Sequence, residues 1–135
     1  MKEISALLAL IAAGSALGGM ARFFVSGLVA RAIGETFPWG TLVVNVTGAF
    51  SIGILAYLAE NHHLADLPQA WPLAVTGFLG SYTTVSSFSL QTLALARDGE
   101  WRQATVNVVL SLVLCLAAVA LGMVAGHAAI AAGIT

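Results

Sequence analysis

Residues 77–89 read GFLGSYTTVSSFS, and they lie near the middle of the uncharged run Leu67–Ala96. The run is long enough to cross a bilayer, because a helix needs ~20 residues to span ~30 Å of hydrocarbon. Its central stretch nevertheless holds two glycines and a cluster of hydroxyl side chains, all of which weaken a helix. The stretch therefore predicts a membrane helix that is broken at its centre.

The composition of the whole chain predicts an all-α integral membrane protein. Only 8 % of the 135 residues are charged, and the mean hydropathy of +0.96 is far above that of soluble globular proteins. The charged residues gather at three breaks between four apolar runs, each longer than the ~20 residues that a membrane helix needs. A chain of this length is expected to be one domain. We expect a single four-helix transmembrane domain over residues 1–135, with helices at about 4–31, 38–60, 70–96 and 102–131.

The positions of aromatic and basic residues agree with this arrangement but hardly fix its orientation. The tryptophans Trp39, Trp71 and Trp101 fall at the edges of apolar runs, as interfacial aromatic residues do. The N-terminus and the second loop together carry one Lys or Arg, whereas the first and third loops carry three. This small difference weakly favours a cytoplasmic position for loops one and three. It also suits a chain that inserts in both orientations and forms an antiparallel pair.

Several classes of function are disfavoured by what the sequence lacks. No Asp, Glu or Lys lies in the central part of any apolar run, although proton-coupled transporters usually rely on such a group. No nucleophile with an adjacent base is visible, and His127 near the C-terminal end has no obvious partner, so an enzyme is not expected. The single cysteine, Cys115, excludes an intrachain disulfide. The net charge of −1 argues against a nucleic-acid partner.

Small and polar residues inside the first two runs need close neighbours, partners or water. Gly14 and Gly18 have the G-x-x-x-G spacing that lets helix backbones approach closely. Arg22, one turn later, either snorkels to the interface or has access to water. Thr41 and Asn45 share one face of the second helix, and Asn45 lies deep enough that an unpaired amide is costly. Asn45 therefore either makes an interhelical hydrogen bond or lines a polar path.

The third and fourth runs carry the strongest indication of an ion site. A broken helix exposes backbone carbonyls, which suit a cation, and N–H groups, which suit an anion. Such backbone is tolerated at membrane depth only inside protein or beside a water-filled path. After the break Thr84, Phe88 and Gln91 share a face, although a lone membrane Phe is more often lipid-facing or core. In the fourth run Asn107, Ser111 and Cys115 form one stripe, in which Cys115 is more often packing than chemistry.

Three stretches of the sequence carry a resemblance to a known family. The first run contains the glycine-rich GSALGGMARF, which ends close to an Arg, and the second contains PWGTLVVNVTGAF. The third is GFLGSYTTVSSFS. Together they resemble the CrcB/Fluc family of fluoride ion channels, whose motifs P-x-G-T-L-x-x-N-x-x-G-x-F and T-G-F-x-G-G-x-T-T-F-S-T-F the last two stretches match at all or most positions. Length, helix number and motif order agree, so the resemblance covers essentially the whole chain.

The resemblance implies a fluoride-selective channel that passively exports fluoride from the cytoplasm across the cell inner membrane and so lowers its toxicity. It implies an antiparallel dual-topology homodimer with two pores, in which a second copy of the chain is the partner. It also implies a central structural Na⁺ held by the main-chain carbonyls of Gly80 and Thr83, and structural roles for Gly14, Gly18 and Arg22. The pore residues that it implies are Asn45, Phe88, Val85, Thr41, Ser86, Ser87, Ser111 and Gln91.

Three residues depart from the family pattern. Val85 stands where the first pore phenylalanine is expected, Ser81 where the second glycine of the break is expected, and Gln91 where many members have an acid. We expect these changes to affect rate or selectivity rather than the activity itself. Three alternatives remain. One is a small dual-topology multidrug-type exporter, which requires an embedded carboxylate. Another is a non-conducting membrane assembly subunit, which predicts tolerance of Asn45→Leu and Phe88→Leu. The third is a channel that has lost conduction through Val85 and Ser81.

Overall fold

The computed structural model describes residues 2–61 and 71–133, and within these ranges every regular element is helical. This confirms the expected all-α class. The expected start of the third helix at residue 70 lies outside the described residues, as do His62 and His63, to which the sequence assigns no role. The elements are α1 (Lys2–Ile33), α2 (Trp39–Glu60), the π-helical segment η1 (Pro72–Leu79), α3 (Gly80–Tyr82), α4 (Val85–Arg97) and α5 (Trp101–Ala131).

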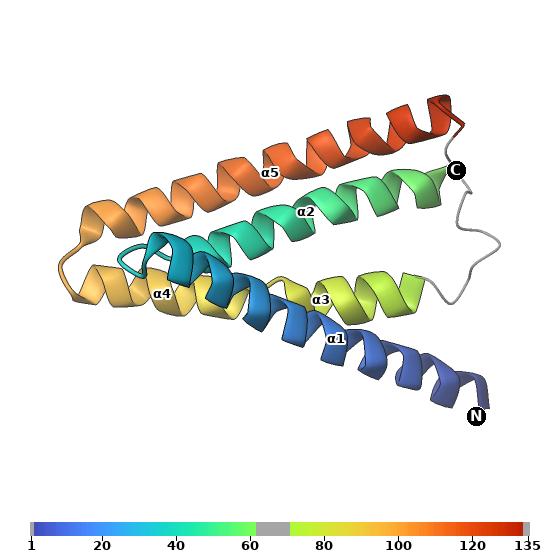
Figure 1. Cartoon of the computed structure of the whole chain (residues 1–135), viewed down its shortest axis with the longest axis horizontal. Helices are drawn as coiled ribbons and strands as arrows, with labels where there is room; N and C mark the ends of the chain where they lie inside the picture. The colour runs from blue at the N-terminus through green and yellow to red at the C-terminus, as the bar shows by residue number, and fades with distance from the viewer. Residues whose placement is uncertain (1, 62–70, 134–135) are drawn as a thin grey trace.

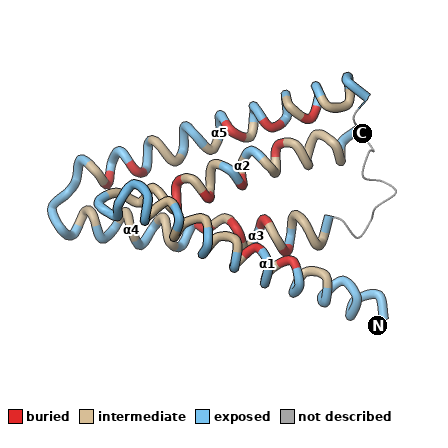
Figure 2. The backbone as a smooth tube through the Cα atoms, viewed as in Figure 1, coloured by how far each residue is buried: buried red, intermediate tan, exposed pale blue. Residues whose placement is uncertain are grey.

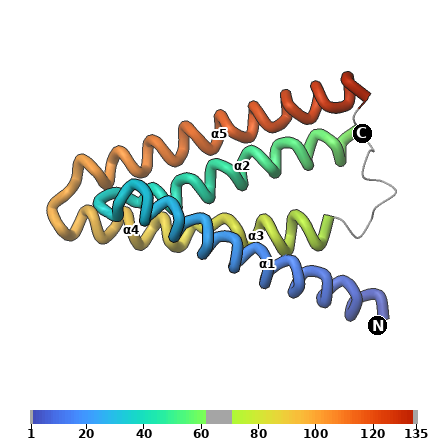
Figure 3. Tube along the Cα trace, in the orientation of Figure 1, coloured from blue at the N-terminus to red at the C-terminus, as the bar shows by residue number. Residues whose placement is uncertain are grey.

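The helices form an up-and-down bundle (Figure 1). α2 and α5 lie side by side, and η1, α3 and α4 follow one another along a third line. α1 crosses this line and packs on η1 and α3 (Figure 3). Within the described residues, α1, α2 and α5 are each long and apolar enough to cross a membrane. Two positive-φ glycines lie in the connections at the end of the bundle opposite the N-terminus, Gly34 at φ 97° after α1 and Gly99 at φ 82° before α5, and a third, Gly133 at φ 66°, follows α5.

Glycines bring the backbones of neighbouring helices into contact at two seams. A Cβ atom at Gly14 would meet the Leu73 carbonyl oxygen, and one at Gly18 would meet the Phe78 carbonyl oxygen, so α1 lies directly on η1. On the other side of the bundle, a Cβ at Gly53 of α2 would lie 3.1 Å from the Cα of Gly122 in α5. Contacts this close leave no room for a side chain, which is how small residues drive helix association in a membrane.

A small core holds the bundle together between these seams. Val44, Leu79 and Tyr82 are buried, and the Tyr82 hydroxyl lies 2.9 Å from the Thr47 hydroxyl of α2. Many other large apolar side chains are exposed, among them Phe23, which is 82 % exposed. Figure 2 shows exposed residues, in pale blue, along α1, α4 and α5. In water such an exposed apolar surface would promote aggregation, but it suits a protein covered by lipid or by another membrane chain.

His127 has a partner that its sequence neighbourhood does not reveal. The Tyr57 hydroxyl lies 2.6 Å from His127 Nδ1, and the two rings meet edge to face at 5.6 Å. The residues are separated by 70 positions in the chain, so only the packing of α2 against α5 brings them together. The expectation that His127 lacks an obvious partner is therefore wrong.

Candidate ion pathway

The third apolar run contains a short extended segment at mid-length. Thr83 has a ψ of 159°, and Thr84 has a φ of −152° and a ψ of 122°, between α3 and α4. Thr84 then caps α4, since its hydroxyl accepts a hydrogen bond from the Ser87 backbone N–H at 3.2 Å. The chain therefore leaves the helix for two residues and begins a new helix at Val85.

Asn45 of α2 binds both backbone groups of Thr84. Its Nδ2 donates to the Thr84 carbonyl at 2.9 Å, and its Oδ1 accepts from the Thr84 N–H at 2.8 Å. Both backbone groups of Thr84 have left the helical pattern and, at this depth, need partners. The single side chain of Asn45 pairs both of them. Asn45 forms the interhelical hydrogen bond that was one of the two alternatives, and its partner is backbone rather than another side chain.

Two backbone carbonyls next to the extended segment lose their usual donors. In a continuous α-helix the Thr84 N–H would donate to the Gly80 carbonyl, and the Ser87 N–H would donate to the Thr83 carbonyl. Here the first N–H donates to Asn45 Oδ1 and the second to Thr84 Oγ1. The carbonyls of Gly80 and Thr83 are therefore freed from α-helical pairing by side chains.

A cluster of hydroxyls surrounds the start of α4. Thr84 Oγ1 lies 3.1 Å from Ser86 Oγ and donates to Ser87 Oγ at 3.2 Å. Thr84 is buried, whereas Ser86 is exposed. Because each hydroxyl has one proton, the two bonds at Thr84 use the protons of Thr84 and Ser86, and the Ser87 proton remains available to an anion.

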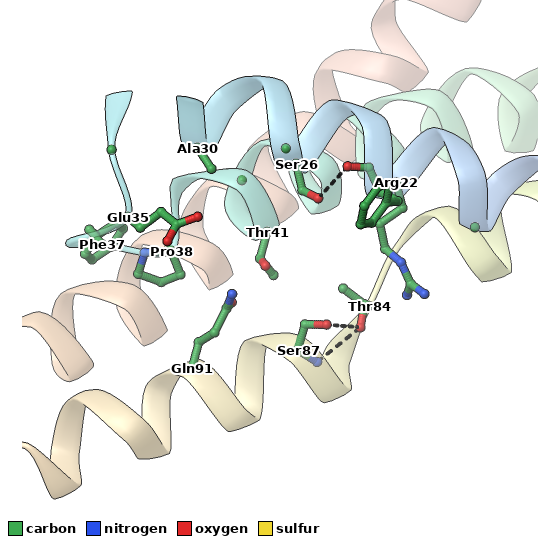
Figure 4. A pocket seen from close by; sticks show the side chains of 15 residues that line it. Arg22, Ser26, Ala30, Glu35, Phe37, Pro38, Thr41, Thr84, Ser87 and Gln91 are labelled. Carbon is green, nitrogen blue, oxygen red and sulfur yellow. Dashed lines mark hydrogen bonds between the residues drawn. The ribbon is translucent and has the colours of Figure 1, made fainter. Parts of the chain in front are cut away.

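A cavity of about 570 Å³ opens between α1, the start of α2 and α4 (Figure 4). Arg22 extends into it from α1, and Gln91 extends from α4 toward Thr41. Gln91 Oε1 is buried and has no hydrogen-bond partner among the described residues. The walls also include Ser26, Glu35, Thr84 and Ser87. This cavity, hereafter the vestibule, combines one guanidinium with several hydroxyls beside the extended segment.

A second cavity of about 420 Å³ lies on the other side of the extended segment. Asn45, Gly80 and Thr83 line it together with apolar residues of α2 and η1 and with Cys115 of α5. Val85 also lines it and is 76 % exposed. This cavity, hereafter the groove, is therefore an open apolar surface with polar backbone at its base.

The structure brings most of the predicted pathway residues together, and leaves three outside both cavities. Phe88 and Ser111 are half-buried and line neither the vestibule nor the groove, and Ser86 is exposed and belongs only to the hydroxyl cluster. The Phe88 carbonyl accepts from the Thr92 hydroxyl at 2.7 Å. The predicted residues that line at least one of the two cavities are Arg22, Thr41, Asn45, Gly80, Thr83, Val85, Ser87 and Gln91.

Two further polar residues were not among the predicted site residues. Thr84 stands at the junction of the vestibule, the groove and the hydroxyl cluster. Its signal in the sequence was a Thr directly before a new hydroxyl-rich helix, which is typical of an N-cap. Asn107, only 2 % exposed, donates to the Thr92 hydroxyl at 2.8 Å and so ties α5 to α4. Within residues 2–61 and 71–133 no group of three His, Cys, Asp or Glu side chains could hold a metal ion.

Comparison with known proteins shows that the chain matches one protein family. The family described as "CrcB-like protein, Camphor Resistance (CrcB)" matches residues 9–123. The chain is 64 % identical over 128 residues to "Fluoride-specific ion channel FluC 2" of Rhodopseudomonas palustris (strain BisB18), a match that covers 94 % of this chain and 98 % of the relative. It is 58 % identical over 116 residues to "Fluoride-specific ion channel FluC" of Opitutus terrae, covering 85 % and 88 %. A relative of the same name from Paramagnetospirillum magneticum is 51 % identical over 118 residues, covering 87 % and 92 %.

Proposed function

Because this chain belongs to the CrcB-like family, we propose that it is a fluoride-selective ion channel. It is a multi-pass membrane protein, and relatives that are 64 % and 58 % identical carry the name of a fluoride-specific channel. Such a protein is not an enzyme. The observation in the molecule that best supports the proposal is the extended segment at Thr83 and Thr84, which Asn45 holds between the vestibule and the groove.

The vestibule is suited to attract and partly dehydrate a small anion. Fluoride holds its water tightly, so a pathway must replace that water with firm donors without binding the ion too strongly. Arg22 supplies a positive charge to a cavity that also holds the Glu35 carboxylate, and the hydroxyls of Thr41 and Ser87 supply neutral donors. Gln91 keeps this wall polar and uncharged, whereas a carboxylate there would repel an anion. The pathway beyond Thr84 continues past Asn45 and, in this proposal, past Phe88 and Ser111.

The freed carbonyls of Gly80 and Thr83 fit the structural Na⁺ that the family resemblance implies. Both residues line the groove, and both carbonyls have lost their α-helical donors to side chains. Carbonyl oxygens of unwound membrane helices are suitable ligands for Na⁺. A cation there would offset the cost of moving anions through a medium of low dielectric.

The groove also supports an antiparallel pair of chains. Its lining is mostly apolar, Val85 on its wall is exposed, and it contains the polar backbone of Gly80 and Thr83, which lipid could not satisfy. A second copy in the opposite orientation would cover this backbone and create two equivalent pathways. No energy source is required, so fluoride would flow down its gradient, which for a cell that has accumulated fluoride means outward.

Measurement of passive ion efflux from liposomes tests the proposal. Purified protein is reconstituted, and fluoride and chloride electrodes record efflux side by side, with protein-free liposomes as the control. We expect rapid loss of fluoride and little loss of chloride. A folded, monodisperse protein that releases no fluoride would favour the assembly-subunit alternative, and release of organic cations driven by a proton gradient would favour the exporter.

Val85 gives a further prediction, because it replaces a ring that could present an electropositive edge to an anion. Val85→Phe is expected to raise the fluoride efflux rate several-fold in the same liposomes. Val85→Leu adds bulk without a ring and should leave the rate close to that of the parent. An equal gain for both variants would show that size rather than the ring edge matters at this position.

A further inference from the structure

We propose that Asn45 and Thr84 are positioning residues that hold the Gly80 and Thr83 carbonyls open, and that they thereby set the affinity of this site for Na⁺. The inference rests on the cation site in the proposed function. It assigns to Asn45 a task separate from contact with fluoride, and it gives Thr84 a role of its own. Both tasks follow from the direction of three hydrogen bonds around the extended segment.

The first carbonyl is kept open by Asn45. The Thr84 N–H is the natural donor to the Gly80 carbonyl, and Asn45 Oδ1 takes this donor at 2.8 Å. Asn45 Nδ2 meanwhile donates to the Thr84 carbonyl at 2.9 Å, which fixes the amide in the orientation that presents Oδ1 to the N–H. Without this side chain the N–H would have to find another acceptor, because an unpaired N–H at this depth is costly. The Gly80 carbonyl is the acceptor that a continuous helix would use.

The second carbonyl is kept open by the Thr84 hydroxyl. The Ser87 N–H, the natural donor to the Thr83 carbonyl, donates to Thr84 Oγ1 at 3.2 Å instead. The hydroxyl is not free to rotate away, since it also contacts the Ser86 and Ser87 hydroxyls. Each freed carbonyl thus depends on one side-chain atom. For Gly80 it is Asn45 Oδ1, and for Thr83 it is Thr84 Oγ1.

Packing reinforces the same conformation. Gly48 of α2 lies against Thr83, so closely that a Cβ there would meet the Thr83 methyl group. Thr83 Oγ1 in turn donates to the Leu79 carbonyl at 2.9 Å, which ties its side chain back to η1. The Thr83 side chain is therefore occupied and turned toward α2 and η1. A cation at this point would rely on backbone oxygens, whose availability is what the two positioning residues control.

Sodium binding to the purified full-length protein tests the inference directly, independently of ion flux. The protein is held in detergent with N-methylglucamine as the background cation, and binding of radioactive Na⁺ is measured by equilibrium dialysis. We expect Thr84→Val and Asn45→Ala to weaken Na⁺ binding about tenfold each, because each removes the side-chain acceptor that keeps one carbonyl free. Thr84→Ser keeps the hydroxyl and is expected to bind Na⁺ as the parent does.

Asn107→Ala is the matched control for Asn45→Ala, because Asn107 is also an interhelical amide but bonds Thr92 away from both cavities. It should bind Na⁺ like the parent. Parent-like binding by Thr84→Val and Asn45→Ala would overturn the inference and leave the proposed channel and its cation site intact. A parent that binds no Na⁺ would overturn the inference together with the cation site, while the efflux assay would still decide the channel. If Asn45→Ala fails to fold, the Thr84 pair decides alone.

Discussion

Gly18→Ala is expected to lose about 3 kcal/mol of folding free energy, the upper part of the range for an overpacked core site. The added methyl group would meet the Phe78 carbonyl oxygen, and the neighbouring backbone atoms of Phe78 are also within contact distance. Backbone cannot rotate aside as a flexible side chain can, so α1 must move away from η1. That movement would open the seam that also contains Gly14 and Gly77.

Gly19→Ala provides the matched control one position along the same helix. A Cβ at Gly19 meets nothing within 4 Å, so this variant should be at least as stable as the parent and gain up to about 1 kcal/mol from helix propensity. Both variants gain the same methyl group and the same helix propensity, which leaves the contact with Phe78 as the difference between them. Thermal unfolding in detergent, followed by circular dichroism, measures both. Equal midpoints for the two variants would show that α1 does not lie on η1 as described.

Asn45→Asp is expected to reduce fluoride efflux at neutral pH by at least about a hundredfold. Two unit charges ~4 Å apart repel by ~4 kcal/mol at an effective dielectric of 20, and a carboxylate beside the pathway places such a charge next to each anion. The ionised side chain also cannot donate to the Thr84 carbonyl, so one of the two bonds to the extended segment is lost. Repulsion and the loss of that bond act in the same direction.

The matching change at Asn107 shows whether a loss of fluoride efflux is specific to Asn45 or is a general effect of a carboxylate inside the bundle. Asn107→Asp also introduces a carboxylate into the bundle, but at a residue that lines neither cavity. Efflux is compared per folded protein, as judged by size-exclusion chromatography before reconstitution. Fluoride efflux that survives Asn45→Asp, or that falls equally in both variants, would mean that Asn45 serves only to join α2 to the third run.

The sequence predicted the class of the fold because apolar run length and charge placement are local properties. The same local signals indicated that GFLGSYTTVSSFS departs from a regular helix, since glycine and hydroxyl clusters carry that tendency in themselves. The exact extended residues could not be located in this way. They depend on Asn45, which lies 39 positions from Thr84, and on Gly48, which packs against Thr83.

Other features depend on contacts that no local pattern encodes. The π-helical form of η1 was not predicted, and its Gly77 lies against the backbone of Ile11 and Gly14 in α1. The partnership of Tyr57 with His127 spans 70 positions and arises only where α2 meets α5. Among the residues that line the two cavities, the sequence pointed to Thr41, Asn45 and Gln91 by their chemistry. It placed Thr84 on a face with Phe88 and Gln91 but gave it no role, because that role comes from its place at the junction.

The glycine seam between α2 and α5 has a mechanical consequence. These two helices touch backbone to backbone at Gly53 and Gly122 and are tied again at Tyr57 and His127, so they can bend little relative to each other. α4, in contrast, meets them through side chains such as Asn107, and it follows a segment that lacks helical stiffness. The α2–α5 pair therefore moves as one rigid unit. Thermal fluctuations in the width of the vestibule should come mainly from small rotations of α4 about Thr84.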